Sequence, residues 1–206
     1  MKIRMALVIS TFALSALGAS AANAAVIFSD NFNSYSFQGN WAPPANWAVP
    51  LPGAVDLIGG TTTATVFDFF PGNGGYVDLG GSNGVAGTLQ TLQSFAAGSY
   101  TLTFDLGGNA RGDGTKTTNI SLGNWSTALS LTSGAAYSLY TYTFVTTGGT
   151  LNFSDLAGGN GSIGNILDNI SLTSAVPEPA IWAMMLIGFG AVGFAIRRKK
   201  ELALAG

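Results

Sequence analysis

The chain has 206 residues, of which 8 are Lys or Arg and 10 are Asp or Glu, and its formal net charge is −2. Charged residues make up 9% of the sequence, far below the roughly one quarter that is usual in soluble domains. There is no His and no Cys, which excludes disulfides, thiol nucleophiles, Ser-His-Asp triads and zinc sites built on these side chains. The acidic balance also argues against nucleic acid as a partner, because phosphate binding needs a basic surface.

The N-terminal segment has the parts of a secretory signal peptide. Two basic residues precede an uncharged apolar run over residues 5–17, and Ala22-Asn23-Ala24 has the small-x-small pattern of a cleavage site. We predict residues 1–24 as a signal peptide that engages the Sec translocon and is cut by signal peptidase, so that the mature chain begins at Ala25. A similar pattern ending at Ala21 offers an alternative cut. A membrane anchor or a buried helix is a further alternative, which the shortness of the run disfavours.

A second uncharged apolar run, residues 180–196, lies near the C-terminus. As a helix with ~1.5 Å rise per residue it would span about 25 Å, close to the thickness of the hydrocarbon core of a bilayer. Four basic residues follow it directly: Arg197, Arg198, Lys199 and Lys200. By the positive-inside rule these stay in the cytoplasm, which predicts an inner-membrane helix over residues 180–196 and a cytoplasmic tail over 201–206. A helix in the core of a soluble domain is the alternative.

Three features occur in order here: Val176-Pro177-Glu178-Pro179, the apolar run with Trp182, and the basic cluster. This arrangement resembles the PEP-CTERM protein-sorting signal of Gram-negative bacteria, over residues 177–200. The resemblance implies processing by an exosortase and a mature protein at the cell surface or in the extracellular matrix. Proline donates no backbone N–H, so the motif stays extended beside the helix, in a form that a protease can bind.

The segment between the two ends predicts an all-β domain. Residues 25–176 hold two basic residues against eight Asp, a net charge of −6, and they contain no long stretch with a helical period. Apolar and polar residues alternate in short runs, most clearly over residues 99–106, and Gly-rich and Asn-rich turns separate about ten such runs. We predict a single antiparallel β-sandwich over residues 25–173, jelly-roll-like rather than immunoglobulin-like, and a linker over 174–176. The phenylalanines expected in its core are Phe67, Phe69, Phe95, Phe104, Phe144 and Phe153.

The domain also resembles the galactose-binding-like β-sandwiches of exported bacterial proteins, through residues 28–32, 98–105 and 167–170. In that family an Asp near the end of the last strand often helps to bind a structural Ca²⁺ with oxygens from the first strand. The resemblance therefore implies a calcium site of Asp30, Asn31 and Asp168, with oxygen ligands that suit this ion. No cofactor is required, and the calcium ion would have a structural role only. Alternation predicts that Asp168 faces inward with Ile170 and Leu172; the alternative is a carboxylate that accepts backbone amides at a strand end.

Three tryptophans are candidates for stacking on sugar rings: Trp41, Trp47 and Trp125. A saccharide site combines such an apolar wall with convergent polar groups, whereas buried aromatic rings more often pack a core. Arg111-Gly112-Asp113 is an integrin-type adhesion tripeptide. Its chance occurrence in a Gly-rich loop explains it better than a role in adhesion, because Gly and Asp are common turn residues.

Catalysis has little support in the sequence. Glycosidases need two positioned carboxylates, and no spacing singles out a pair. We expect Asp68, Asp78 and Asp105 to be solvated residues on outer strand faces. The predicted function is therefore non-enzymatic: an exported surface protein, structural or adhesive, in contact with exopolysaccharide and able to bind carbohydrate. The alternatives are a secreted carbohydrate-active enzyme that uses Asp pairs, and a membrane-anchored protein whose tail is never cut.

Overall fold

The structure is a computed structural model that describes residues 24–60, 67–156, 161–174, 185–194 and 197. The predicted signal peptide before Ala24 lies outside the described residues. The sorting-motif residues outside them are Pro177, Glu178, Pro179, Arg198, Lys199 and Lys200. Residues Asn23–Val176 form one compact unit, and β1 begins at Ala25.

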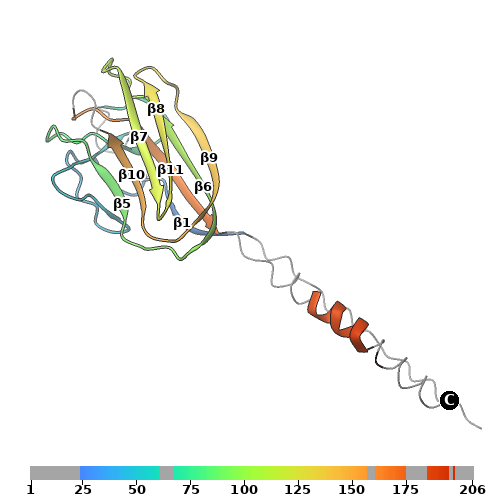
Figure 1. The fold of residues 1–206 in the computed structure, drawn as a ribbon. Coiled ribbons are helices and arrows are strands. Elements are labelled where there is room, and N and C mark those ends of the chain that lie inside the picture. Colours follow the sequence, from blue (N-terminus) through green and yellow to red (C-terminus); the bar gives the residue numbers. More distant parts are fainter. Residues whose placement is uncertain (1–23, 61–66, 157–160, 175–184, 195–196, 198–206) are drawn as a thin grey trace, which may run out of the picture. The chain divides into compact units, whose positions relative to one another are not determined.

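Two antiparallel sheets form a sandwich, as Figure 1 shows. The first sheet contains β1 (Ala25–Asp30), β3 (Asp56–Gly59), β4 (Gly75–Asp78), β6 (Gly98–Gly107), β9 (Ser138–Thr146) and β11 (Ile166–Ser174). The second contains β2 (Trp47–Ala48), β5 (Thr88–Thr91), β7 (Thr115–Leu122), β8 (Trp125–Thr132) and β10 (Leu151–Leu156). These sheets confirm the prediction of an all-β antiparallel sandwich.

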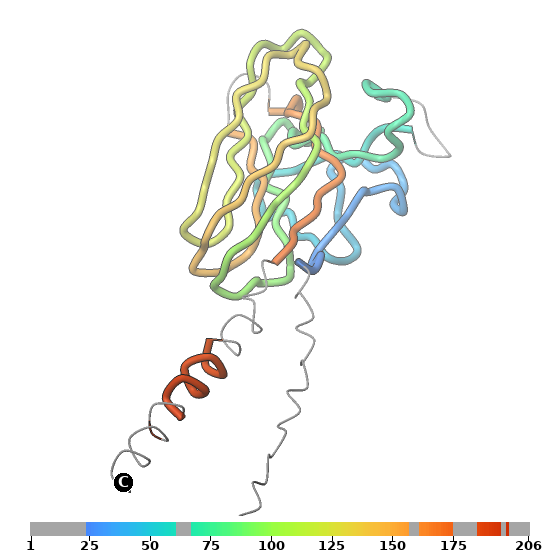
Figure 2. The backbone as a smooth tube through the Cα atoms, turned by 90° about the vertical axis from the view of Figure 1, so that its right-hand side faces the viewer, coloured from blue at the N-terminus to red at the C-terminus, as the bar shows by residue number. Residues whose placement is uncertain are grey.

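Strand β11 organises the first sheet, whose order is β3-β4-β11-β6-β9. Strand β6 follows one of its edges, and the other edge is shared by β4 at residues 166–167 and by β1 at residues 170–174. Because Ala25 pairs with Ser174, the domain starts and ends side by side, at one end of the sandwich (Figure 2). The second sheet has the order β2-β5-β10-β7-β8.

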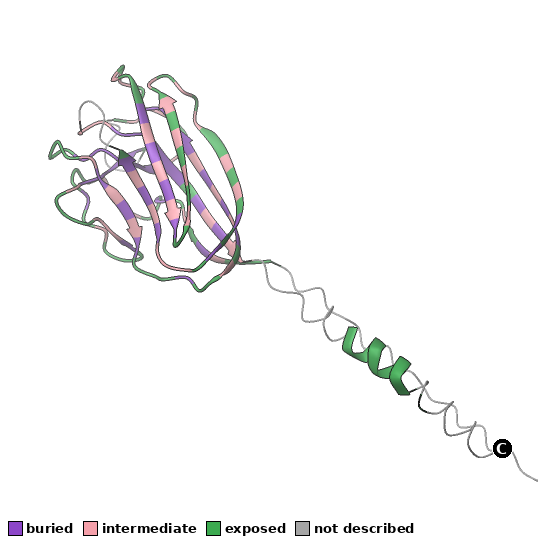
Figure 3. Cartoon of the chain, in the orientation of Figure 1, coloured by how far each residue is buried: buried purple, intermediate pink, exposed green. Residues whose placement is uncertain are grey.

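The core lies between the sheets, and burial alternates along the strands as a half-buried sheet requires (Figure 3). Along β6, Tyr100, Leu102, Phe104 and Leu106 are buried, which confirms the alternation predicted for this run. Of the expected core phenylalanines, four are buried: Phe95, Phe104, Phe144 and Phe153.

The expectation was wrong for Phe67, which is 51% exposed. Its φ of 68° lies in the left-handed region, so it belongs to a turn and to no strand. Phe69 packs against a second, smaller cluster of buried side chains: Ile58, Tyr76 and Ile166. Both hydrophobic clusters and the eleven described strands lie within residues 25–174, so this unit contains its own core.

A β-bulge changes the direction of side chains within β11. The pairing with β6 shifts register between Asp168 and Ser171, and Asn169 adopts a φ of 50°. Asp168 pairs with Asp105, whereas its neighbours Leu167 and Ile170 point into the main core. The prediction that Asp168 faces inward with Ile170 and Leu172 was therefore wrong, because strict alternation does not continue through a bulge.

Residues 185–194 are helical and exposed. They lie inside the run 180–196 that the sequence predicts as a transmembrane helix, whose remaining residues are outside the described part. Among the described residues, no helix combines the length and the apolarity needed to cross a membrane.

Candidate functional site

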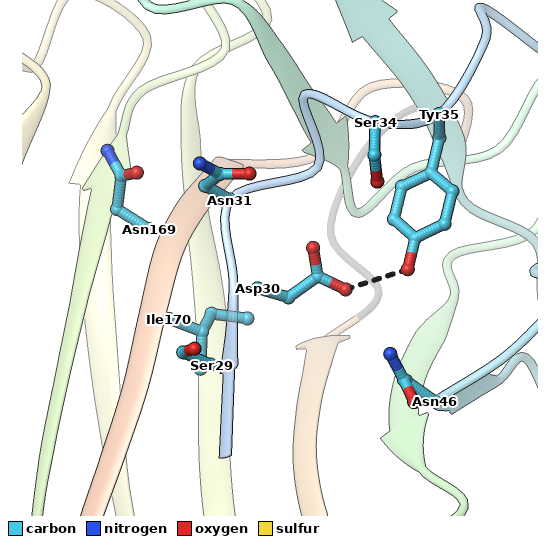
Figure 4. A pocket seen from close by; sticks show the side chains of 8 residues that line it. All are labelled: Ser29, Asp30, Asn31, Ser34, Tyr35, Asn46, Asn169 and Ile170. Carbon is cyan, nitrogen blue, oxygen red and sulfur yellow. Dashed lines mark hydrogen bonds between the residues drawn. The ribbon is translucent and has the colours of Figure 1, made fainter. Parts of the chain in front are cut away.

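A polar pocket of ≈ 460 Å³ opens where β1 runs beside β11, and Figure 4 shows it. Asp30 lies at its centre, with Tyr35 and Asn46 on one side and Asn31 and Asn169 on the other. The remaining lining residues are Ser29, Ser34 and Ile170. Six residues thus offer side-chain amide or hydroxyl groups around one carboxylate, so the Asp30 pocket has both donors and acceptors for a polar ligand.

Hydrogen bonds hold the Asp30 carboxylate in place from three directions. The backbone N–H of Phe32 donates to Oδ1 at 2.9 Å. The phenol of Tyr35 and the indole Nε1 of Trp47 both donate to Oδ2, at 3.0 and 2.8 Å. Burial and the neighbouring Asp30 carboxylate raise the pKa of Tyr35, so this phenol stays a donor. The pocket floor is therefore built in advance of any ligand.

The three candidate tryptophans do not form one surface. Trp41 and Trp47 belong to the main core, with exposed fractions of 4% and 1%, and both line an apolar hollow of ≈ 520 Å³ with Pro43 and Val49. Trp125 is half-buried on β8 and stacks on Phe144, with ring centroids 3.8 Å apart. The three rings therefore provide no shared surface on which a sugar could stack.

The residues predicted to bind calcium are divided between two faces of a sheet. Asp30 pairs with Ile170 and shares its inward face, whereas Asp168 pairs with Asp105 on the opposite face. Asp30 and Asn31 both line the Asp30 pocket, and Asp168 does not. In the described part of the chain, no group of three or more acidic, His or Cys side chains is placed to hold a metal ion. The residues named for calcium are thus not gathered into one ligand set, and the ion stays a prediction.

Asp168 is fully buried on that opposite face. Its Oδ1 accepts a hydrogen bond from the backbone N–H of Asn169 at 2.6 Å, and its Oδ2 has no hydrogen-bond partner. The Tyr137 hydroxyl lies near the Asp168 carboxylate, although the two groups do not reach hydrogen-bond geometry. Burial raises the pKa of Asp168 to about 7.

A second pocket, of ≈ 380 Å³, lies at the end of the sandwich where β11 begins. Asp56 and Asp78 are directly opposite each other in the β3–β4 pair, and both line it. Its other lining residues are apolar, cationic or hydroxyl-bearing: Phe37, Ile58, Phe67, Ile163, Arg111, Ser82 and Ser162. We call this group the acid-pair pocket. No sequence spacing pointed to it, because Asp56 and Asp78 meet only through strand pairing.

Both carboxylates of the acid-pair pocket are occupied by protein donors. Asp56 accepts from the backbone of Asn40 and from both the N–H and the hydroxyl of Ser82. Asp78 accepts from the N–H groups of Gly80 and Gly164 at 2.9 and 2.8 Å. Glycine is required at position 80, because a Cβ there would lie 2.5 Å from the nitrogen of Ile163. These carboxylates therefore join loops that are distant in sequence.

Asp78 also forms an ion pair with Arg111, and its exposed fraction is 1%. The expectation that Asp78 is a solvated outer-face residue was therefore wrong. Burial raises the pKa of Asp78 to about 6, against the opposing effect of Arg111. Asp113 pairs with the buried Lys116 at 2.6 Å. The Arg111-Gly112-Asp113 tripeptide thus has both charged side chains in ion pairs within the domain.

Comparison with known proteins identifies the C-terminal segment and the fold. Residues 175–199 match the model of the PEP-CTERM protein-sorting motif. No curated protein matches the chain significantly in sequence. The K1 cleaved adhesin domain of Lys-gingipain from Porphyromonas gingivalis W83 has a similar structure, with 13% identity and a TM-score of 0.52. The match covers 72% of this chain and 98% of that domain, which shows a shared fold.

Two carbohydrate-binding modules have a lower similarity. The family 35 module from Clostridium thermocellum is 15% identical, with a TM-score of 0.39 over 63% of this chain and 92% of that one. A module of lichenase 5A from Cellvibrio mixtus, in complex with cellotriose, is 14% identical, with a TM-score of 0.38 over 74% and 100%. Scores of this size establish no common topology. The chain is therefore a protein with a PEP-CTERM sorting motif, preceded by an antiparallel β-sandwich like that of a cleaved adhesin domain.

Proposed function

We propose that this protein is exported, held in the inner membrane by its C-terminal segment, and released by an exosortase to the cell surface or the exopolysaccharide. There its jelly-roll-like sandwich has a structural or adhesive role and binds a saccharide without turning it over. The match of residues 175–199 to the PEP-CTERM motif is the observation that carries the sorting part. The uncharged run 180–196 and the basic residues after it support the anchor and its orientation.

The Asp30 pocket supports the binding part. A saccharide ring presents hydroxyls that need donors and acceptors at once, and the amides of Asn31, Asn46 and Asn169 supply both. None of the described residues that line the pocket is basic, so it offers no ion pair to a phosphate, sulfate or uronate. We therefore propose a neutral saccharide as its ligand.

Sorting is tested by mass spectrometry of the protein recovered from the bacterial surface. We expect a mature N-terminus at Ala25 and a C-terminus upstream of the apolar run, whereas Glu178→Ala should keep the tail. A surface protein that still ends at Gly206 would show that the tail is not cut, and would favour the anchored alternative.

Binding is tested on a glycan array with residues 24–176, followed by titration of the neutral glycans retained. Asn31→Ala and Ser34→Ala should each weaken binding roughly 2- to 10-fold, because a net hydrogen bond contributes about 0.5–1.5 kcal/mol. Asn119→Ala on β7, in the other sheet, is the matched control and should bind as wild type. An array on which no neutral glycan is retained would contradict the proposal.

The acid-pair pocket gives the alternative, a carbohydrate-active enzyme, a specific test. Asp56 and Asp78 are paired across one cavity, and the raised pKa of Asp78 is a property of general acids. Yet both carboxylates accept two or more hydrogen bonds from loops. The test is whether the domain hydrolyses chromogenic glycosides. Activity that is lost in both Asp56→Asn and Asp78→Asn, with folding intact, would show that the protein is an enzyme and would contradict the proposed binding function.

A further inference from the structure

Strand β9 has one edge that pairs with no other strand among the described residues. It is the last strand of the first sheet, at the margin of the sandwich in Figure 1. Its other edge pairs with β6 over its full length, from Ser138 with Leu106 to Thr146 with Gly98, and the register contains no bulge. A regular row of backbone donors and acceptors is therefore available on the open side.

Nothing in the sequence of β9 protects this edge. Natural sheets block open edges with a charged residue, a proline or a bulge, because a regular edge pairs with other chains. Residues 138–146 contain no charge and no proline. In addition, Leu139 and Val145 are 66% and 70% exposed, next to the same edge, which is a poor arrangement for a strand that stays in water.

The residues of β9 are chemically symmetric about Tyr142. Threonine lies on each side of it, then an aromatic residue, then an aliphatic one, then a small hydroxyl residue. The symmetric pairs are Thr141 and Thr143, Tyr140 and Phe144, Leu139 and Val145, Ser138 and Thr146. The first three pairs also share a face, since the threonines and aliphatic residues are exposed, while the half-buried Tyr140 and the buried Phe144 both pack against the core.

We infer that β9 pairs with β9 of a second copy of this chain, antiparallel, about a two-fold axis at Tyr142. An axis perpendicular to the sheet keeps each face on its own side, so each residue meets its symmetric counterpart. Leu139 of each copy then lies opposite Val145 of the other copy. Thr141 of each copy likewise lies opposite Thr143 of the other. Such aliphatic, aromatic and Thr–Thr cross-strand pairs stabilise antiparallel sheets. The first sheet of one copy and the first sheet of the other then form one continuous sheet across the dimer.

The other open margin, β8, does not have this property. It is the last strand of the second sheet and also lacks charge. A two-fold axis at Ala128, near its centre, would place Thr127 opposite Leu129, a polar residue against an apolar one. The symmetry of β9 about Tyr142 fixes a single register that can be tested.

The test is the mass of residues 24–176 in solution, by sedimentation velocity and light scattering. We expect a dimer for wild type and a monomer for Leu139→Lys and for Val145→Asp, because each variant places a charge opposite an apolar residue twice. The double variant L139K/V145D should restore the dimer, since the new lysine meets the new aspartate of the other copy at both positions. Salt should weaken this restored dimer.

Leu92→Lys is the matched control, because Leu92 is 63% exposed and lies outside the strands. It should remain dimeric. Circular dichroism and thermal melting of each variant separate loss of the dimer from loss of the fold. A wild-type domain that is monomeric at every accessible concentration would overturn the inference. So would a folded Leu139→Lys variant that stays dimeric, or a folded double variant that stays monomeric.

Discussion

The indole of Trp47 donates a 2.8 Å hydrogen bond to the carboxylate of Asp30, which lies 17 residues earlier in the chain. Trp47 is 1% exposed and packs edge to face on Phe28, so this bond ties the polar pocket directly to the core. Because the tryptophan side chain cannot move within a packed core, the carboxylate is fixed too. The shape of the pocket therefore depends on a residue whose ring belongs to the core.

The first prediction concerns Asp30→Asn. An amide has only one acceptor oxygen, so its NH₂ group would face either the Phe32 N–H or the two donors from Tyr35 and Trp47. A buried donor without a partner costs about 1–3 kcal/mol, and we expect a loss of this size in urea unfolding of residues 24–176. Tyr35→Phe removes a single donor and should cost less. Equal stability of Asp30→Asn and wild type would show that the bonds contribute little.

The second prediction concerns pH. Burial raises the pKa values of Asp155 and Asp168 to about 7 and that of Asp78 to about 6, from an ordinary value of 3.8. Between about pH 4 and 7 the folded state therefore holds protons that the unfolded chain has released. This contribution to stability is complete below pH 4 and is lost as the pH rises through 7. We expect the melting temperature to be higher at pH 5 than at pH 8.

Asp155→Asn identifies one source of this pH dependence. Its Oδ1 has no hydrogen-bond partner, so a neutral amide removes a buried charge without breaking a hydrogen bond of that atom. The variant should melt above wild type at pH 8 and close to it at pH 5. A melting temperature that increases from pH 5 to pH 8 in wild type would contradict the predicted direction.

The third prediction concerns Arg111, which pairs with Asp78, donates from Nε to the carbonyl of Asn109 at 3.3 Å, and lies 5.0 Å from the ring centroid of Phe69. A lysine has a single point of charge and cannot make these contacts together. Arg111→Lys should therefore destabilise the domain by about 1–3 kcal/mol in chemical unfolding. An unchanged unfolding midpoint would mean that the ion pair is replaced by water at no cost.

The fourth prediction concerns calcium. The sequence resemblance implies that the ion raises the melting temperature of wild type and that EDTA lowers it. Asp168→Ala should melt at a lower temperature and lose any response to calcium, while Asp105→Ala, its cross-strand partner, reports whether the neighbouring carboxylate takes part. A wild-type melting temperature that EDTA leaves unchanged would show that calcium does not stabilise this domain.

Much of the fold could be predicted because the signals are local. Alternation with a period of two identified β6, and the turn residues around it marked its ends. Asp168 shows where this reasoning stops. The bulge after it depends on the pairing with β6. A run of alternating residues in the sequence does not show where a bulge inserts an extra residue. The pairing of Asp56 with Asp78, and hence the acid-pair pocket, was not visible for the same reason.

The sequence by itself determined the sorting motif, because its proline pair, apolar run and basic cluster are contiguous and act through composition and order. It also determined the fold class, since turns and alternation are properties of neighbouring residues. Only the tertiary structure decided which carboxylates share a pocket, which of them are buried, and which strand keeps an open edge. These outcomes depend on pairs such as Ala25 with Ser174, far apart in the chain, whose contact results from the packing of the whole domain.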